Sequence, residues 1–149
     1  MKDYNYLQQK WMVNTYPNRG IVLEKGIGAY LIDQNGKKYL DCMTNYGVNI
    51  FGYGYLAIHK ALMSQLSTLI TLHGSFVSGK RAQASQMIVE SCGLTYAQMY
   101  WSNSGAEAVE AALKFAVLAT GKTRFITCSH AYHGKTLGAL SATDGEKYR

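Results

Sequence analysis

The sequence predicts an α/β fold that begins with a small antiparallel meander and continues into the start of a parallel-sheet domain. Two extended runs within residues 21–41 flank Asn35-Gly36, a pair typical of a type I′ hairpin turn. From residue 98 onward the pattern alternates strand, helix, strand, helix, as in a parallel α/β unit. We therefore expect an N-terminal segment with the meander, residues 1–45, and an incomplete larger domain, residues 46–149.

The spacing of apolar residues predicts the individual elements. A first long helix is indicated by apolar residues at helical intervals: Ile58, Leu62, Leu66 and Leu69. A second helix, over residues 81–92, ends before Gly93, which suits the C′ position. The remaining segments are short strands at residues 98–101 and 124–128 and helices at residues 106–119 and 136–142.

The central predicted helix, residues 106–119, is amphipathic. Its apolar stripe contains Ala108, Val109, Ala112, Leu113, Ala116 and Val117. On the opposite face Glu110 and Lys114 have the i,i+4 spacing of an ion pair. The small residues of the stripe predict close packing against a sheet.

Composition indicates a globular chain, with 48% hydrophobic and 16% charged residues. The net charge is +6, but the basic residues are scattered, so we expect no nucleic-acid interface. No segment approaches the roughly 20 apolar residues of a membrane helix, and the first residues lack the apolar run of a secretion signal, so we expect neither. Three cysteines in apolar stretches, Cys42, Cys92 and Cys128, predict buried free thiols and a cytoplasmic protein. The sequence stops at Arg149 soon after a predicted helix, and we expect a truncated chain.

The segment between the first predicted parallel strand and the central helix, residues 101–108, reads Trp-Ser-Asn-Ser-Gly-Ala-Glu-Ala. Ser104 and Glu107 fit a capping box, which makes Ser104 the N-cap. The amides of Gly105 and Ala106 then have no intrahelical acceptor and can bind a phosphate. We call Ser104, Gly105 and Ala106 the phosphate cradle. Capping boxes are common, and these residues alone also fit a helix that binds nothing.

A second motif follows the second predicted strand and places an aromatic residue at the same sheet edge. It reads Ser-His-Ala-Tyr-His-Gly-Lys-Thr over residues 129–136, and we call Tyr132 to Lys135 the aromatic turn. Tyr132 could stack on a flat heterocycle, or it could simply pack within the loop. A nucleotide-binding P-loop is a further alternative, although Ser129 stands where that motif requires its first glycine.

The two motifs together resemble the class III aminotransferases, and most closely their acetylornithine branch. The resemblance rests on Ser-Asn-Ser-Gly-Ala-Glu-Ala, then Glu-Ala-Ala-Leu-Lys, then Tyr-His-Gly-Lys-Thr-Leu-Gly-Ala-Leu-Ser-Ala-Thr. It implies the N-terminal part of the fold-type I fold of enzymes dependent on pyridoxal 5′-phosphate (PLP). It also implies that Gly105 and Ala106, with Ser104 beside them, bind the PLP phosphate. Tyr132 would stack on the pyridine ring, and His133 would shape that turn.

The resemblance also indicates what this chain lacks and where it differs. The Schiff-base lysine of such enzymes falls outside the chain, so we expect these 149 residues alone to be inactive. Lys135 occupies the position of an arginine that binds the substrate carboxylate in relatives, so the amino donor is open. Residues 52–56, Gly-Tyr-Gly-Tyr-Leu, replace the Gly-His-x-His-Pro of relatives.

For the intact protein the resemblance implies amino transfer from an ω-amino donor such as acetylornithine to 2-oxoglutarate, by a homodimer without bound metal. The alternative is a non-catalytic fragment, or a module that acts by association. Its basis is that the resemblance implies a main sheet of seven strands, of which this chain would have two, so that strand edges and the apolar stripe of the central helix would be only partly covered.

Overall fold

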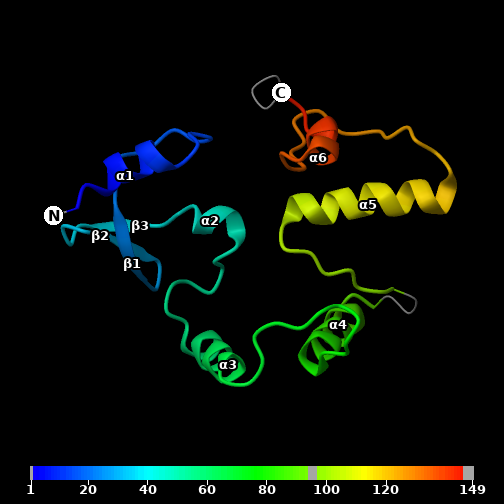
Figure 1. The fold of residues 1–149 in the computed structure, drawn as a ribbon, viewed down its shortest axis with the longest axis horizontal. Coiled ribbons are helices and arrows are strands. Elements are labelled where there is room, and N and C mark those ends of the chain that lie inside the picture. The colour runs from blue at the N-terminus through cyan, green and yellow to red at the C-terminus, as the bar shows by residue number, and fades with distance from the viewer. Residues whose placement is uncertain (1, 94–96, 146–149) are drawn as a thin grey trace. The chain divides into compact units, whose positions relative to one another are not determined.

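The computed structural model describes residues 2–93 and 97–145, and the chain divides into two compact units, residues 1–73 and 74–149. Figure 1 shows the elements in chain order. The first unit contains α1 (Tyr4–Trp11), β1 (Leu23–Ile27), β2 (Tyr30–Asp33), β3 (Lys38–Leu40), α2 (Thr44–Gly47) and α3 (Leu56–Leu66). The second contains α4 (Gly79–Ser91), α5 (Gly105–Thr120) and α6 (Leu137–Ala142). The predicted domains, residues 1–45 and 46–149, belong to a longer fold and stay a prediction. The chain end at Arg149 lies outside the described residues.

The predicted antiparallel meander is confirmed, with strand order β1-β2-β3. The turn at Asn35-Gly36 is not type I′, because that turn needs a positive φ at both residues and only Gly36 has one, 81°. The carboxylate of Asp33 accepts the amides of Asn35 and Lys37 at 2.9 Å each. This side chain therefore organises a longer loop, which closes where the amide of Asp33 donates to the carbonyl of Lys37.

Helices α3 and α4 confirm the predicted helical segments with shifted ends. α3 ends at Leu66, so Leu69 lies beyond it. α4 begins after Ser78, whose hydroxyl accepts the amide of Arg81 at 3.3 Å. Gly93 has a φ of 64° directly after the last residues of α4, as predicted for a C′ glycine.

The two strands predicted in the second unit, residues 98–101 and 124–128, do not form among the described residues, where β1-β2-β3 is the only sheet. A parallel strand depends on hydrogen bonds to neighbouring strands, and within this part of the chain neither segment has a neighbouring strand to pair with. Side chains anchor the first segment instead. Trp101 Nε1 donates to Ser85 Oγ of α4 at 2.8 Å, and the ring of Tyr100 meets Phe115 of α5 edge-on.

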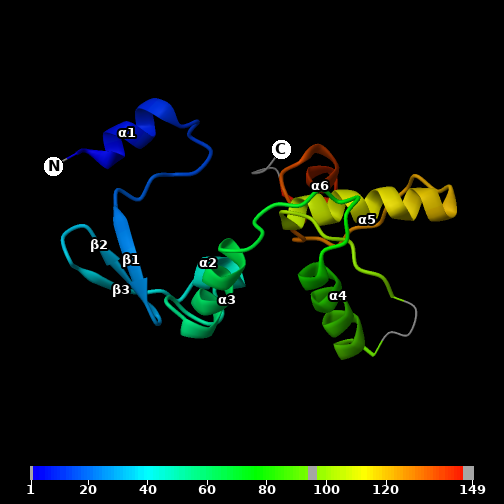
Figure 2. The same cartoon turned by 60° about the horizontal axis from the view of Figure 1, so that its bottom comes forward.

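The core within the described residues is small. Its buried apolar side chains are Ile32 in β2 and two alanines of α6, Ala139 and Ala142. Helices α5 and α6 pack against each other, as Figure 2 shows. The predicted burial of the cysteines is wrong: all three are free but exposed. The alanines of the α5 stripe are exposed as well. Both the thiols and these alanines are exposed because few other residues of this chain lie over them.

Candidate functional site

The start of α5 has the predicted capping geometry. Ser104 is the N-cap, with extended backbone angles, and its hydroxyl accepts the amide of Glu107 at 3.2 Å. The Glu107 carboxylate reaches back to the amide of Asn103 at 2.7 Å, one residue earlier than in the usual capping box. The cap thus uses the amides of residues 103 and 107 and leaves those between them available.

The amides of the phosphate cradle are open. Among the described residues, the N–H groups of Gly105 and Ala106 donate to no protein acceptor. A side-chain carbon added at Gly105 would meet no atom within 4 Å, so open space surrounds this position. α5 is 16 residues long, and its aligned peptide dipoles favour an anion at this end. The arrangement can therefore bind a phosphate.

The aromatic turn lies against the cradle. A Cβ added at Gly134 would lie 2.7 Å from Cβ and 3.1 Å from Cα of Ala106. Two motifs that are about thirty residues apart in the sequence therefore meet at the start of α5. Tyr132 is 54% exposed and its ring is accessible, while His133 is half-buried and lines an apolar hollow beside Val109. Lys135 is exposed.

Thr143, which the sequence reasoning missed, holds the aromatic turn in place. Its side chain is fully buried directly after α6. The hydroxyl accepts the amides of His133 at 3.0 Å and Gly134 at 3.3 Å. It also lies 3.0 Å from the carbonyl oxygen of Gly134 and 2.9 Å from that of Ala139. Its single proton can be donated to either of these two oxygens. One side chain thus contacts the amide and the carbonyl of Gly134, on either side of its Cα.

Glu110 was predicted to pair with Lys114, and this prediction is wrong in the described structure. Its carboxylate instead accepts the amides of Gly138 at 2.8 Å and Ala139 at 3.2 Å, and it also accepts the hydroxyl of Thr136. The Thr136 bond is the largest cause of a lowered pKa at Glu110, followed by the two amides, while burial acts in the opposite direction. Three donors at the start of α6 outweigh one solvated ammonium group.

The same contact excludes the P-loop alternative. A P-loop offers the amides at its helix start to the phosphates of a nucleotide. The helix after residues 129–136 is α6, and Glu110 already occupies its amides at Gly138 and Ala139.

In the first unit, Tyr53 fixes the loop in which relatives were expected to carry histidines. Its backbone pairs with Gly28 through two hydrogen bonds, of 2.8 and 2.9 Å, and its ring fills the space beside Gly26. Its hydroxyl donates to Asp41 Oδ2 at 2.7 Å. This bond is the main cause that lowers the pKa of Asp41 below 3.8; burial opposes it, and the amides of Thr44 and Met43 assist it. Tyr53 therefore has a structural role.

Because the pKa of Asp41 is lower in the folded chain, its contribution to stability is complete above its ordinary value and is lost as the pH falls through the lowered value. We expect Tyr53→Phe to raise the pKa of Asp41 toward 3.8. Titration of the Asp41 carboxyl carbon by NMR measures this shift. Tyr55→Phe is the matched control, because it also removes a tyrosine hydroxyl, from a ring that stacks on Phe51. It should leave the pKa of Asp41 unchanged. An equal pKa in the Tyr53 variant and the parent would contradict the assignment.

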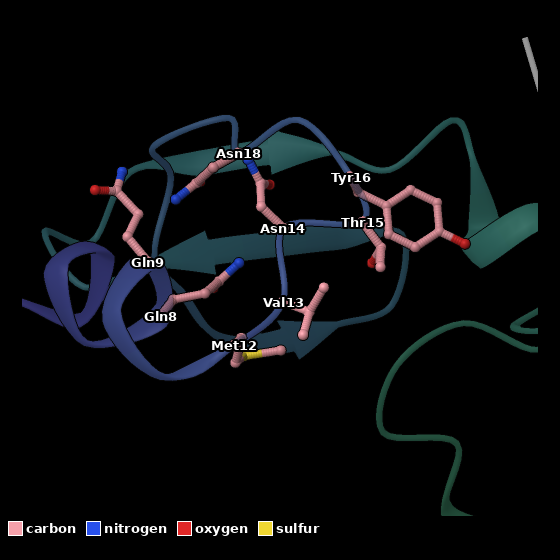
Figure 3. Close-up of a pocket in the computed structure, with 8 residues that line it drawn as sticks. All are labelled: Gln8, Gln9, Met12, Val13, Asn14, Thr15, Tyr16 and Asn18. Atoms are coloured by element: carbon pink, nitrogen blue, oxygen red, sulfur yellow. The ribbon is translucent and has the colours of Figure 1, made fainter.

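A separate hollow of about 220 Å³ lies beside α1 in the first unit (Figure 3). Its lining residues are Gln8, Gln9, Met12, Val13, Asn14, Thr15, Tyr16 and Asn18. They include no carboxylate, imidazole or ammonium group, and no predicted site residue. In the part of the chain that the structure describes, no cluster of residues could hold a metal ion, and no helix has the length and apolar character needed to cross a membrane.

Known proteins are similar to this chain in sequence and in fold. The chain is 37% identical over 140 residues to an acetylornithine aminotransferase of Methanosarcina acetivorans, covering 94% of this chain and 35% of that protein. It is 36% identical over 142 residues to a LysW-aminoadipate semialdehyde transaminase of Deinococcus radiodurans, covering 95% and 33%. The chain thus spans about a third of the length of these relatives.

A solved structure has the same fold over most of the chain. It is the taurine:2-oxoglutarate aminotransferase of Bifidobacterium kashiwanohense in complex with PLP and glutamate. The TM-score is 0.88 at 23% identity, over 96% of this chain and 33% of that one. This likeness confirms the predicted fold class and shows that the chain has part of a transaminase fold. Residues 12–149 match the aminotransferase class-III family, and the chain therefore belongs to that family, as its two motifs predicted.

Proposed function

We propose that this chain supplies the phosphate-binding and ring-stacking part of a PLP-dependent aminotransferase. The observation that carries the proposal is the contact of Gly134 with Ala106, which places the aromatic turn beside two open amides. The residues fit the cofactor, because the space around Gly105 admits a phosphate and the exposed ring of Tyr132 can lie against a heterocycle. PLP supplies an electron sink for amino transfer when it is bound.

In this proposal each residue of the site has a defined role. Gly105 and Ala106 donate their amides to the phosphate, with the Ser104 hydroxyl beside them. Tyr132 stacks on the pyridine ring, and the backbone of His133 and Gly134 sets its height above the cradle. Lys135 offers a point charge to the substrate carboxylate, without the bidentate geometry of an arginine. The Schiff-base lysine is proposed to lie outside these 149 residues.

For the whole protein we propose amino transfer from an ω-amino donor to 2-oxoglutarate by a cytoplasmic homodimer. The relatives support this donor class, since one is named for acetylornithine, which carries an amino group at its ω-position, and the other for LysW-aminoadipate semialdehyde, which carries the matching aldehyde there. The three free cysteines suit a reducing compartment.

Binding of PLP and of inorganic phosphate to the 149-residue chain tests the cradle. We expect both to bind, and Gly105→Val to weaken both by roughly tenfold or more, because its side chain occupies the phosphate space. Gly79→Val is the matched control, because Gly79 also follows a serine N-cap, begins a helix and has open space around it. Equal affinities in the two variants would exclude the cradle.

Borohydride reduction followed by mass spectrometry tests the position of the Schiff-base lysine. We expect PLP to bind without stoichiometric labelling of any single lysine, since the reactive lysine is proposed to lie outside the chain. Complete labelling at one site, Lys114 or Lys135 for example, would show that the chain carries its own.

The association module is a second candidate, favoured by exposed apolar side chains in the second unit. Phe76, Val77, Ile126 and Leu137 are among them. This candidate predicts oligomers in sedimentation experiments and no selective binding of PLP. The two candidates are separated by Gly105→Val, which should change PLP affinity but leave self-association unaltered.

A further inference from the structure

α6 is attached to α5 by the carboxylate of Glu110. This side chain accepts the amides of Gly138 and Ala139 and the hydroxyl of Thr136. It also fills the space where residue 138 would carry a Cβ, so the glycine there admits the carboxylate. α6 is six residues long and buries only Ala139 and Ala142 as apolar side chains, so this contact is a large part of what holds it.

The other end of α6 is attached to the aromatic turn. Thr143 binds the amides of His133 and Gly134, and the amide of Asp144 donates to the carbonyl of Ala131 at 2.9 Å. The Asp144 carboxylate also accepts the amide of His130. The backbone on the approach to the turn therefore moves with α6.

These contacts connect α5 to α6, α6 to the aromatic turn, and the aromatic turn back to α5. Ala106, which touches Gly134, and Glu110, which binds α6, are four residues apart and lie one above the other on the helix. The distance between the turn and the cradle is thus set by how α6 sits on residue 110.

We propose that Glu110 is a positioning residue that, through α6 and Thr143, holds the aromatic turn over the phosphate cradle. The proposal rests on the proposed function, since the ring needs this position only when a heterocycle is attached to the bound phosphate. In this proposal Glu110 itself contacts neither the phosphate nor the heterocycle. Its loss should weaken ring stacking and leave phosphate binding intact.

The test compares two affinities in the full 149-residue chain, for PLP and for inorganic phosphate. We expect Glu110→Ala to raise the Kd for PLP roughly two- to tenfold, the range for losing one ring-stacking contact, with little change for phosphate. Glu110→Gln keeps an oxygen acceptor for the two amides and should restore most of the PLP affinity. Glu90→Ala, a surface glutamate of α4 that accepts Gln86 Nε2, is the control and should change neither affinity.

Hydrogen exchange supplies a readout that needs no cofactor. The amides of His133 and Gly134 should exchange faster in Glu110→Ala than in the parent, because the turn loosens. Thr136→Val removes one donor to the same carboxylate and is a milder change, usable if the alanine variant does not fold. It should shift both readouts in the same direction.

The outcomes separate the two proposals. If the parent chain binds phosphate and PLP, but Glu110→Ala and Thr136→Val leave the ratio of affinities and the amide exchange unchanged, the positioning role is wrong. If the parent binds neither ligand, the proposed function fails, and the positioning role toward PLP fails with it even where amide exchange rises. A fall in phosphate and PLP affinity together would show that Glu110 supports the cradle as a whole, which also overturns the proposal.

Discussion

Replacing Gly134 with alanine is expected to displace the aromatic turn from the start of α5 and to lower the free energy of unfolding by about 2–5 kcal/mol. The added Cβ would lie 2.7 Å from Cβ of Ala106, closer than such carbons approach, and 3.0 Å from Cβ of Ala139, a tight contact. The φ of Gly134, 138°, adds strain for any residue with a side chain. PLP affinity should fall, while the affinity for inorganic phosphate changes less, because the amides of the cradle remain open.

Urea unfolding and ligand titration of the same samples measure this prediction. Gly79→Ala is the control, because its added methyl group meets no atom within 4 Å and its φ is ordinary. Ala106→Gly combined with Gly134→Ala removes the tightest contact and should recover part of the lost stability. If the single Gly134 variant unfolds and binds PLP like the parent, the turn does not pack on α5 as described.

Elements with local determinants were predictable from the sequence. The start of α5 depends on Ser104 and Glu107, three residues apart, and the end of α4 depends on Gly93. The strands at residues 98–101 and 124–128 depend on neighbours elsewhere, so apolar spacing indicated strands that do not form in this part of the chain. The left-handed run at Thr44, Asn45 and Tyr46 gave no sequence signal, because residues other than glycine adopt this conformation singly and rarely in a run.

The same distinction applies to the site. The cradle was predicted because its cap and its open amides lie within a few residues of each other. Glu110 was assigned to Lys114 because i,i+4 spacing is a local pattern, whereas the two amides that donate to it lie 28 and 29 residues later. The available signal was Gly138, a glycine at the second position of a helix, which leaves room for a carboxylate from another element. Thr143 offered no comparable signal, since one hydroxyl after a helix usually faces solvent.

Replacing Thr143 with valine is expected to cost about 2–4 kcal/mol of unfolding free energy, because the isosteric side chain leaves buried groups without partners. The amides of His133 and Gly134 lose their acceptor, and a carbonyl at Gly134 or Ala139 loses its donor. The shape of the site is preserved, so the loss measures the hydroxyl alone.

Thr143→Ser separates the hydroxyl from the methyl group. It keeps all these hydrogen bonds and should cost only about 1 kcal/mol for the methyl group that it removes. In urea unfolding the valine variant should therefore be clearly less stable than the serine variant, and the amides of His133 and Gly134 should exchange faster in the valine variant. Equal stability of the two variants would mean that packing, and not hydrogen bonding, holds the aromatic turn. The route from Glu110 through α6 to the turn would then be broken at Thr143, because methyl packing does not fix the direction of the amide and the carbonyl of Gly134.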